Sequence, residues 1–323
     1  HASIERDTAA IEPFVIDGAV RGVIAERNGR RETIEARALV LADGGFQGNA
    51  DLMRRYVTPH PEKLLQRGAG SGQGVGLTMA ASLGAELVGL DSFYGHLLGR
   101  EALTNDQLWP YPTVDAVAQA SIVIGADGRR IADEGMGGVY LANQVAKLSD
   151  PLSTSVIFDE QTWQELAADN RYPPCLNPAF VDVGGTVLSA PTIAALAEQL
   201  SVDTGALGET VDTYNAAMEA GTLASLTPAR TEPGSQARAI RVPPFHAIEL
   251  CAGITYTMGG IRVDPQGRVR HQDRRIIEGL YATGSCVGGF EGGAQAAYLG
   301  GLAKAVITAL RAAHAIAHDQ GRT

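Results

Sequence analysis

The last third of the chain most limits what the chain can fold into, because apolar runs there lead repeatedly into glycine-rich turns. It contains the stretches GITYTMGGIRVDPQGRV (253–269), GLYATGS (279–285) and GGAQAAYLGGLAKAVITALRAAHAIA (292–317). We expect a hairpin that carries a glycine pair, then a buried strand, a glycine loop, and a helix that begins after two glycines. A strand, a glycine turn and a helix N-terminus in this order present backbone N–H groups to a bound anion or polar ring edge. The sequence therefore predicts that the tail holds a ligand.

Composition and charge exclude several classes of protein. The chain has 323 residues, of which 45% are hydrophobic and 19% charged, as in a globular protein of one large or two interlocked domains. Its net charge of −10 disfavours nucleic acid and anionic membranes as partners. The apolar runs are too short for a bilayer, so no membrane span is expected.

The three cysteines, Cys175, Cys251 and Cys286, are widely spaced and lack a CxxC pattern. An odd number of isolated cysteines disfavours a disulfide framework or a zinc site and fits a reducing compartment. We therefore expect a cytoplasmic protein without a bound metal. Cys286 is interpreted as a small residue that fills its loop.

Two further glycine-rich turns precede the tail. The turn Ala42-Asp43-Gly44-Gly45 follows the apolar run 38–41, and GAGSGQGVG (68–76) opens the apolar-periodic segment 77–87. Neither has the GxGxxG spacing of a dinucleotide fingerprint. Three such turns, at 42–46, 68–76 and 284–301, nevertheless suggest one extended ligand that passes several backbone turns, and a dinucleotide is the natural candidate.

The middle of the chain, from about residue 91 to 241, differs from both ends. Aromatic residues and prolines become more frequent, and the patterns predict helices over 138–146, 160–168 and 192–199. Short strands are predicted at 121–124 and 155–158. We interpret this block as an inserted α+β domain.

Five motifs, in order along the chain, carry a resemblance to a known family. They are ALVLADGGF (38–46), GQGVGLTMAASLGAEL (72–87), DGRRIADEG (127–135), TMGGIRVD (257–264), and GLYATGS (279–285) with Gly300-Gly301 downstream. Together they resemble flavoproteins of the fumarate reductase/succinate dehydrogenase family, in the branch with soluble fumarate reductases, 3-ketosteroid dehydrogenases and tricarballylate dehydrogenase.

The resemblance implies an α/β fold with an α+β cap, namely a partial Rossmann-like FAD-binding domain with an inserted capping domain. Residues 1–92 and 242–323 would form the FAD-binding domain, and residues 93–241 the capping or substrate domain. The implied activity is that of an FAD-dependent oxidoreductase acting on CH–CH groups, by dehydrogenation or ene-reduction at an activated C–C bond with hydride transfer at flavin N5. The implied partners are a small-molecule substrate and an external electron carrier. The residues expected to bind FAD are Ala42, Asp43, Gly44, Gly45, Gly72, Gln73, Gly74, Gly259, Gly260, Gly284, Ser285, Gly300, Gly301 and Leu302.

The chain departs from the family pattern at its beginning. Family members start with a βαβ unit whose GxGxxG turn holds the FAD pyrophosphate, and His1 aligns after that unit. The chain thus resembles the C-terminal portion of such a protein, and we expect it to bind FAD weakly or not at all by itself. The alternatives are a non-catalytic fragment, or a split-enzyme subunit whose βαβ segment comes from a separate chain.

A second departure concerns the cations that bind and protonate a dicarboxylate in fumarate-reducing members. The corresponding positions here are Gly138, Tyr256 (or Thr255) and Tyr298, so fumarate reduction is not expected. Phenols suit a less charged substrate, because they donate to a ketone oxygen or act as acid or base. Tyr298, Tyr256 and His246 are therefore the candidate catalytic residues.

Each candidate also has a structural interpretation. Tyr298 can pack at the helix entrance, Tyr256 can make a cross-strand contact, and His246 can be a buried histidine with a satisfied hydrogen bond. Elsewhere, Glu291 is the only carboxylate of its glycine-rich loop. Arg130 with Glu134 is interpreted as an ion pair inside the cap or a helix-capping arrangement, and Tyr94 with His96 as either cleft lining or a hinge.

Overall fold

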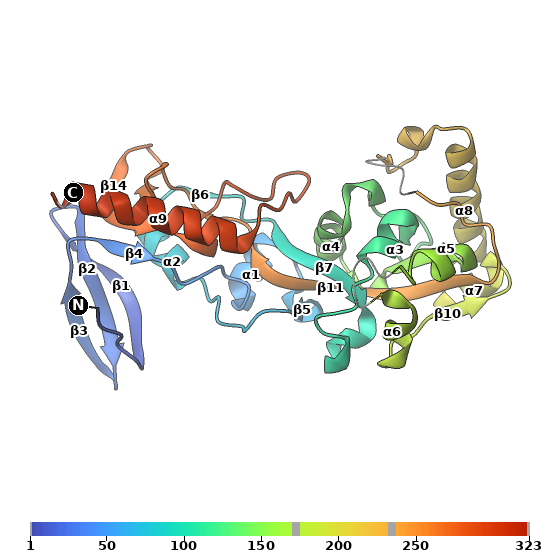
Figure 1. The fold of residues 1–323 in the computed structure, drawn as a ribbon, viewed down its shortest axis with the longest axis horizontal. Coiled ribbons are helices and arrows are strands. Elements are labelled where there is room, and N and C mark those ends of the chain that lie inside the picture. Colours follow the sequence, from blue (N-terminus) through green and yellow to red (C-terminus); the bar gives the residue numbers. More distant parts are fainter. Residues whose placement is uncertain (1, 170–174, 232–236, 322–323) are drawn as a thin grey trace. The chain divides into compact units, whose positions relative to one another are not determined.

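The computed structural model describes residues 2–169, 175–231 and 237–321, and the chain divides into two compact units (Figure 1). Unit 1 comprises His1–Val57, Gly68–Tyr94 and Tyr256–Thr323. Unit 2 comprises Thr58–Arg67 and Gly95–Thr255. Helices and sheets occur in both, as expected for an α/β fold with an α+β cap.

The units differ from the predicted domain boundaries at residues 58–67 and 242–255, which lie in unit 2. The reason is a long strand, β11 (Phe245–Thr257), whose first residues pair with other strands of unit 2. The short strand β5 (Leu65–Gln66) also pairs with β11, in parallel. The functional division into FAD-binding and capping domains stays a prediction.

Unit 1 contains an antiparallel sheet of three strands, a second sheet of three strands, a two-stranded pair, and the helices packed around them. Its strands are β1 (Thr8–Ile16), β2 (Ala19–Arg27), β3 (Arg30–Glu35), β4 (Leu39–Leu41), β6 (Leu87–Val88), β12 (Gly260–Ile261), β13 (Arg268–Arg270) and β14 (Ile276–Ala282). Its helices are α1 (Ala50–Tyr56), α2 (Val75–Ser82), α9 (Gly301–Asp319) and the 3-10 turn η7 (Gly284–Cys286).

Two tight turns with characteristic sequences connect the strands of the β1–β2–β3 sheet. Asp17-Gly18 joins β1 to β2 and Asn28-Gly29 joins β2 to β3, and all four residues have positive φ. Positive φ at both central residues is the requirement of a type I′ hairpin turn, which glycine, asparagine and aspartate meet most easily. This sheet follows directly from the local sequence.

The second sheet has the order β13–β14–β4, and β4 is its last strand in the described part of the chain. β4 runs parallel to β14, with Leu39 opposite Leu280 and Leu41 opposite Ala282. Helix α9 contacts β14 and η7 (Figure 1). A strand from each end of the chain therefore forms one sheet.

The predicted hairpin over 253–269 is only partly correct. The glycine pair Gly259-Gly260 is not its turn, because β11 ends at Thr257 and β12 pairs with β6 instead. The tight turn lies further on, where Gly267 N donates to Asp264 O over 2.9 Å, and Val263 bridges Val269. The apolar run up to Thr257 is long because β11 is a central strand of unit 2 and not one arm of a hairpin.

Unit 2 is built around a sheet that includes the order β10–β11–β9–β8. Its remaining strands are β7 (Phe93–Gly99), β8 (Ile122–Ile124), β9 (Ser155–Asp159) and β10 (Leu188–Ala190). Its helices are α3 (Asp115–Ala120), α4 (Gly138–Ala146), α5 (Glu160–Glu165), α6 (Leu176–Asp182), α7 (Ile193–Leu200) and α8 (Thr204–Glu219). Its 3-10 turns are η1 (Pro61–Lys63), η2 (Arg100–Leu103), η3 (Asp106–Leu108), η4 (Glu134–Met136), η5 (Pro151–Ser153) and η6 (Leu223–Ser225).

Helix α8 was not predicted from the sequence. It contains Gly205 and Gly208, which lower helix propensity, and its outward face is polar. Asp203 caps it by accepting a hydrogen bond from Ala206 N at 2.7 Å, and Tyr214 is fully buried in the core of unit 2. Tertiary packing therefore decides the conformation of this segment.

A buried ion cluster also holds unit 2 together. Arg130 Nε lies 3.0 Å from Glu134 Oε1, and Arg230 Nη1 lies 3.2 Å from Glu134 Oε2. All three side chains are buried. The structural interpretation of Arg130 and Glu134 is thus confirmed, with Arg230 as an additional partner.

Candidate functional site

The glycine turns of unit 1 meet at one edge of the β13–β14–β4 sheet. Because β4 and β14 are parallel, the turn after β4 and the turn after β14 leave the sheet at the same edge. Thr283 N donates to Leu41 O over 2.9 Å, which fixes the two turns side by side. This edge is where open α/β sheets bind their ligands.

The other predicted FAD-binding segments lie beside these two turns. Gly74 N donates to Gly45 O over 3.2 Å, and Phe46 N donates to Thr257 Oγ1 over 3.0 Å. Gly284 N, in the turn after β14, donates to Thr308 Oγ1 of α9 over 2.9 Å. The structure thus brings together segments that are far apart in the sequence.

Packing within unit 1 accounts for several of the glycines. A Cβ on Gly45 would lie 2.3 Å from Thr257 Oγ1, and one on Gly260 would lie 2.1 Å from Cys286 O. A Cβ on Gly259 would lie 2.1 Å from the backbone of Gly89. These positions exclude a side chain whether or not a ligand is bound, so their glycines are weak evidence for one.

The first two turns contain similar internal contacts. Asp43 caps α2, because its carboxylate accepts a hydrogen bond of 2.8 Å from a backbone N–H in the first turn of that helix. A Cβ on Gly72 would clash with Gln47, and one on Gly74 would clash with Phe46. These side-chain contacts are structural, and any contact of Asp43 with FAD through its backbone stays a prediction.

Three glycines remain open toward solvent and fit a dinucleotide. Gly44, Gly284 and Gly300 have φ values of +90°, +69° and +111°. A Cβ on Gly44 would meet nothing within 4 Å, and on the other two it would meet only a methyl group at 3.8–3.9 Å. Gly300 has no side chain to cap α9, and Gly301 N donates to Tyr298 Oη over 3.3 Å. Among the described residues, the next N–H groups of the first turn have no side-chain acceptor, so the start of this helix still offers backbone N–H groups.

The remaining predicted residues belong to the same turns. Ala42 and Gln73 are exposed, Ser285 is half-buried, and Leu302 is strongly exposed on the first turn of α9. Their contacts with FAD stay predictions.

Three tyrosines from different elements gather at the start of α9. Tyr94 comes from β7, Tyr256 from β11, and Tyr298 from the loop before the helix. The Tyr94 and Tyr298 rings stack with centroids 3.9 Å apart and an interplanar angle of 14°. The Tyr94 and Tyr256 rings lie 5.6 Å apart. The two candidate catalytic tyrosines are thus part of one aromatic cluster, and Tyr94 is its third member.

A buried ion pair lies beside this cluster. Lys304 Nζ is 2.8 Å from Glu291 Oε2, and the two side chains are 1% and 0% exposed. Tyr256 Oη donates to Glu291 Oε1 over 2.9 Å, and Leu299 N donates to the same oxygen over 3.1 Å. Burial, and then the hydrogen bond to Glu291 and its charge, raise the pKa of Tyr256 above its usual range.

Sequence reasoning did not identify Lys304. The signal was a single lysine in the first turns of an alanine-rich helix, where the helix dipole disfavours a positive charge. Such a position calls for a nearby carboxylate, and Glu291 provides it.

His246 belongs to unit 2, whereas the three tyrosines of the cluster belong to unit 1. Its Nε2 is 2.7 Å from Glu160 Oε2, and its ring stacks on Phe158 with centroids 5.4 Å apart. The side chain is buried. These contacts give His246 a structural function, and an acid or base role for it stays a prediction.

Gly138 lies where the family resemblance implies an arginine in fumarate-reducing members, and it is closely packed. It begins α4, and a Cβ there would lie 2.2 Å from the carboxyl carbon of Asp115. Asp115 in turn contacts His96 and accepts a hydrogen bond of 2.8 Å from Leu97 N. This local packing leaves no room for a larger residue.

The cysteines behave as buried apolar residues or loop fillers. The three thiols are free, and Cys286 donates to Leu41 O at 3.1 Å. Burial raises the pKa of the Cys286 thiol to about 12. Such a thiol is inert at neutral pH, in agreement with its interpretation as a loop filler.

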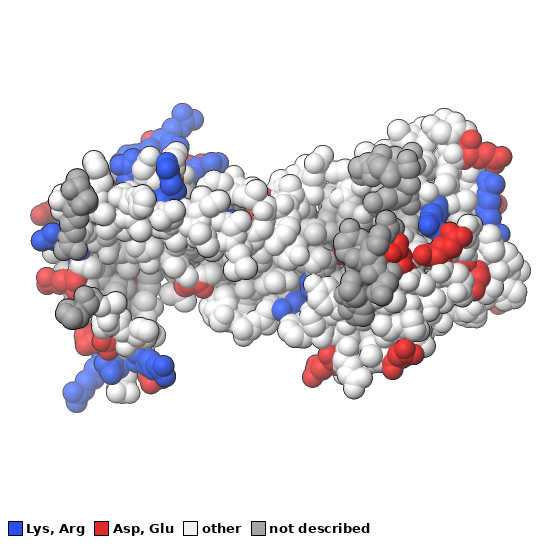
Figure 2. Space-filling view, in the orientation of Figure 1, with Lys and Arg blue, Asp and Glu red and all other residues white. Residues whose placement is uncertain are grey.

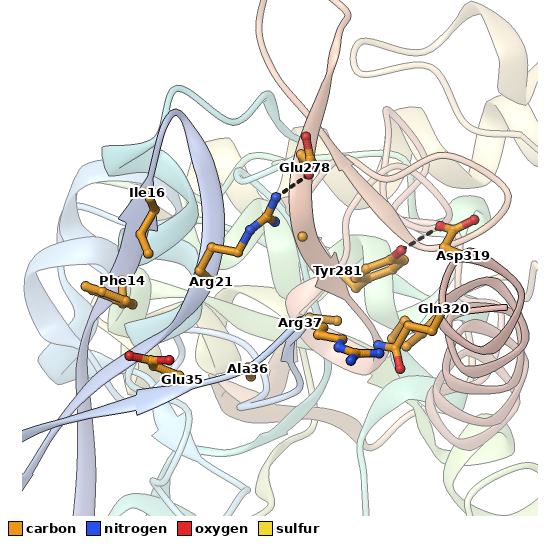
Figure 3. Close-up of a pocket in the computed structure, with 13 residues that line it drawn as sticks. Phe14, Ile16, Arg21, Glu35, Ala36, Arg37, Glu278, Tyr281, Asp319 and Gln320 are labelled. Atoms are coloured by element: carbon orange, nitrogen blue, oxygen red, sulfur yellow. Dashed lines mark hydrogen bonds and ion pairs between the residues drawn. The ribbon is translucent and has the colours of Figure 1, made fainter. Parts of the chain in front are cut away.

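An open cavity of about 790 Å³ lies at the other end of β4 and β14 (Figure 3). Figure 3 shows Arg21 directed toward Glu278, with 2.5 Å between Nη2 and Oε1, and Tyr281 directed toward Asp319. Tyr281 Oη donates to Asp319 Oδ2 over 3.0 Å, and burial followed by this hydrogen bond raises the pKa of Tyr281 to about 12. The cavity borders residues that precede β4, whereas the glycine turns follow it.

The described residues contain neither a cluster of metal ligands nor a helix that could span a membrane. No group of three or more His, Cys, Asp or Glu side chains among them is arranged to hold a metal ion. In the same part of the chain, no helix combines the length and apolar character that crossing a membrane requires.

Comparison with curated proteins identifies similar oxidoreductases. The chain is 27% identical over 294 residues to an NADH:fumarate oxidoreductase of Klebsiella pneumoniae, covering 89% of this chain and 29% of that protein. It is 25% identical over 318 residues to a 3-oxosteroid 1-dehydrogenase of Mycobacterium tuberculosis, covering 87% of this chain and 54% of that one. The chain therefore spans about half, or less, of the curated relatives it matches.

Solved structures share the fold. A 3-ketosteroid delta1-dehydrogenase from Sterolibacterium denitrificans matches with a TM-score of 0.69 and 21% identity, covering 97% of this chain and 59% of that one. The open conformation of a flavocytochrome c3 fumarate reductase matches with a TM-score of 0.56 and 20% identity, covering 94% and 50%.

The glycine turns, the open start of α9 and these similarities agree with a family model described as an FAD binding domain, which matches residues 4–298. The cofactor of that family is FAD. The chain belongs to the FAD binding domain family.

Proposed function

We propose that residues 1–323 form part of an FAD-dependent oxidoreductase that dehydrogenates or reduces an activated C–C bond in an uncharged small molecule. The observation that carries the proposal is the tyrosine cluster at the start of α9, beside the turns that fit FAD. The reaction direction is left open, and electrons would be exchanged with an external carrier.

The charges of the cluster favour an uncharged substrate. The ammonium group beside the cluster, on Lys304, is paired with Glu291, and the lysine side chain is 1% exposed. This group therefore cannot bind a substrate carboxylate. Tyr298 is 48% exposed and offers a phenol instead. A phenol binds a ketone or hydroxyl oxygen by a hydrogen bond and does not need a charged partner. This arrangement supports an activated ketone over a dicarboxylate.

Gly44, Gly284 and Gly300 would hold FAD through their open backbone turns, together with the first N–H groups of α9. When bound, FAD supplies hydride transfer at its N5 atom. The contribution of Tyr256 and Tyr298 is to bind the substrate, orient the reacting carbons and hold a proton at each phenol oxygen.

Helix α9 has an unusual distribution of side chains. Lys304 and Thr308 face inward, whereas Leu302, Val306 and Leu310 are 86%, 65% and 55% exposed. Ile307 adds to this surface, and Figure 2 shows few charged side chains along it. An exposed apolar surface of this kind marks a place where another segment packs.

We propose that a βαβ segment outside residues 1–323 covers the apolar side of α9 and extends the sheet at β4. The position of β4 as last strand, in the described part of the chain, supports this. The relatives supply a second argument, because each is much longer than its match to this chain. The segment would belong to the same polypeptide or to a separate chain, and it would supply the turn that binds the FAD pyrophosphate.

The proposal predicts how flavin binding depends on this segment. Purified residues 1–323, mixed with FAD and separated by gel filtration, should retain far less than one flavin per chain by absorbance at 450 nm. A co-expressed βαβ segment with a GxGxxG turn should restore a stoichiometric amount, because it adds charge-assisted hydrogen bonds to the pyrophosphate.

Two outcomes would count against this reading. Stoichiometric flavin on residues 1–323 alone would show that the added segment is unnecessary. No flavin in either preparation would contradict FAD binding by these residues and would favour a non-catalytic fragment. The intact mass of the native protein then distinguishes a segment of the same polypeptide from a separate chain.

Charged substitutions on α9 test the covering segment directly. Val306→Glu combined with Leu310→Glu should reduce self-association of residues 1–323 in light scattering, because the exposed apolar area shrinks. The same variant should fail to retain the co-expressed βαβ segment on an affinity column. Val181→Glu, at an apolar residue of α6 that is 49% exposed, is the matched control and should retain it. Retention by both variants would refute packing on α9.

A further inference from the structure

The hydrogen bond between Tyr256 and Glu291 has a defined direction. A carboxylate only accepts hydrogen bonds, so the phenol must donate its proton to Glu291 Oε1, 2.9 Å away. The proton of Tyr256 is then directed toward the buried ion pair. What Tyr256 Oη can still offer to another group is a lone pair, and therefore an acceptor.

Tyr298 has the opposite arrangement. Its hydroxyl oxygen lies 3.3 Å from Gly301 N, which donates to it. Within the described residues the structure gives this hydroxyl no acceptor, so its proton is available to a bound molecule. The two phenols at the start of α9 therefore differ in polarity.

Forming the ion pair between Lys304 and Glu291, which produces this difference, costs free energy. Lys304 lies in the first turns of α9, where the partial positive charge of the helix end opposes an ammonium group. It is also removed from water, as is Glu291. The carboxylate of Glu291 accepts two further hydrogen bonds, from Tyr256 Oη and Leu299 N. The contacts of the pair thus converge on the carboxylate that orients Tyr256.

We propose that Glu291, neutralised by Lys304, is a positioning residue that directs the Tyr256 proton inward, so that Tyr256 meets the substrate as an acceptor and Tyr298 meets it as a donor. This inference rests on the proposed function for the presence of a substrate, but the orientation of Tyr256 is a property of the protein alone. The ligand that fits is an uncharged molecule with a carbonyl oxygen for Tyr298 and a polarised C–H or O–H group for Tyr256.

In the described part of the chain, the charged and titratable groups that face Tyr256 come from other segments. Glu291 comes from the glycine-rich loop, Lys304 from α9, Tyr94 from β7 and Tyr298 from the loop before α9. Burial and Glu291 raise the pKa of Tyr256, and the neighbouring tyrosines add to this to a smaller extent. The group is therefore held in its neutral, protonated form.

The experiment places 3,5-difluorotyrosine at position 256 of residues 1–323 and follows its ionisation by 19F NMR. Fluorination makes the phenol more acidic, so the titration falls in a pH range where the protein stays folded. The double variant Glu291→Gln, Lys304→Met removes the pair without leaving a buried charge. Its titration midpoint should be lower by about one pH unit or more, because the phenol loses the adjacent negative charge and bonds at most to a neutral amide oxygen. Loss of the Lys304 ammonium acts in the opposite direction but is the smaller effect, since Nζ lies 5.7 Å from the ring centroid whereas Glu291 Oε1 lies 2.9 Å from the phenol oxygen.

A matched control uses the second tyrosine–carboxylate pair of unit 1. Tyr281 donates to Asp319 near the end of α9, without a buried ammonium group beside it. Asp319→Asn should leave the midpoint at position 256 unchanged and lower it for difluorotyrosine at position 281. Circular dichroism confirms that each variant is folded over the titrated range.

Equal midpoints at position 256 in the parent protein and the double variant would overturn the inference, since a merely structural pair would change stability only. This readout needs no FAD and no substrate. A failure of flavin binding therefore contradicts the proposed function without affecting the inference, and a failure of the titration contradicts the inference alone.

Discussion

Replacing Tyr298 by phenylalanine in the FAD-loaded protein is expected to lower kcat by about 100-fold, the usual effect of losing one donor to a developing oxyanion. The variant keeps the aromatic ring, so the stack on Tyr94 is retained. The loss should appear in kcat and kcat/KM together, because the hydrogen bond strengthens as charge develops on the substrate oxygen. Stopped-flow absorbance at 450 nm with an α,β-unsaturated ketone substrate measures it.

The matched control is Tyr281→Phe, which also removes a hydroxyl from a tyrosine of unit 1 but lies near the other end of α9. It should retain the parent kcat. Tyr256→Phe should slow turnover by at least tenfold, because it removes the phenol oxygen that accepts from the substrate. Unchanged rates for Tyr298→Phe and Tyr256→Phe in a protein with full flavin content would remove both residues from the site.

Lys304→Met should lower the free energy of unfolding by about 3–5 kcal/mol, the range observed when one partner of a buried ion pair is removed. The substitution leaves Glu291 fully buried without its ammonium partner, with only Tyr256 and Leu299 as donors. Urea unfolding followed by circular dichroism measures the change, and the m-value shows whether the native state is otherwise unaltered.

The double variant Glu291→Gln, Lys304→Met should be clearly more stable than Lys304→Met, because it leaves no uncompensated charge. The difference between the two variants isolates the unpaired carboxylate from the loss of lysine packing. Equal stability of Lys304→Met and the parent protein would mean that the pair is hydrated in solution, contrary to its burial in the structure.

Local signals predicted the parts of the fold that depend on neighbouring residues. The helix over 138–146 and the helix after Gly300 follow from propensity and periodicity. Helix α8 was missed because its glycines weaken the pattern and its burial comes from distant strands. The hairpin was misplaced because β11 pairs with segments that no local pattern indicates.

The candidate site was predictable in its residue types but not in its contacts. The sequence suggested the glycine turns and two of the tyrosines, since each follows a strand or precedes a helix. It could not show that Gly45 and Gly260 are required by packing, because the atoms they avoid are far away in the chain. It also could not pair Glu291 with Lys304 and Tyr256, which come from three separate segments.

The pairing of β4 with β14 has a consequence for the order in which the protein is made. Leu39 is placed opposite Leu280, so the β13–β14–β4 sheet cannot close until both segments have been synthesised. The residues of unit 2 are complete earlier, at Thr255. During synthesis, β4 and α1 therefore expose apolar surface until β14 has been made, and the residues of unit 2 are complete before that. Exposed apolar surface of this kind is what chaperones bind on nascent chains.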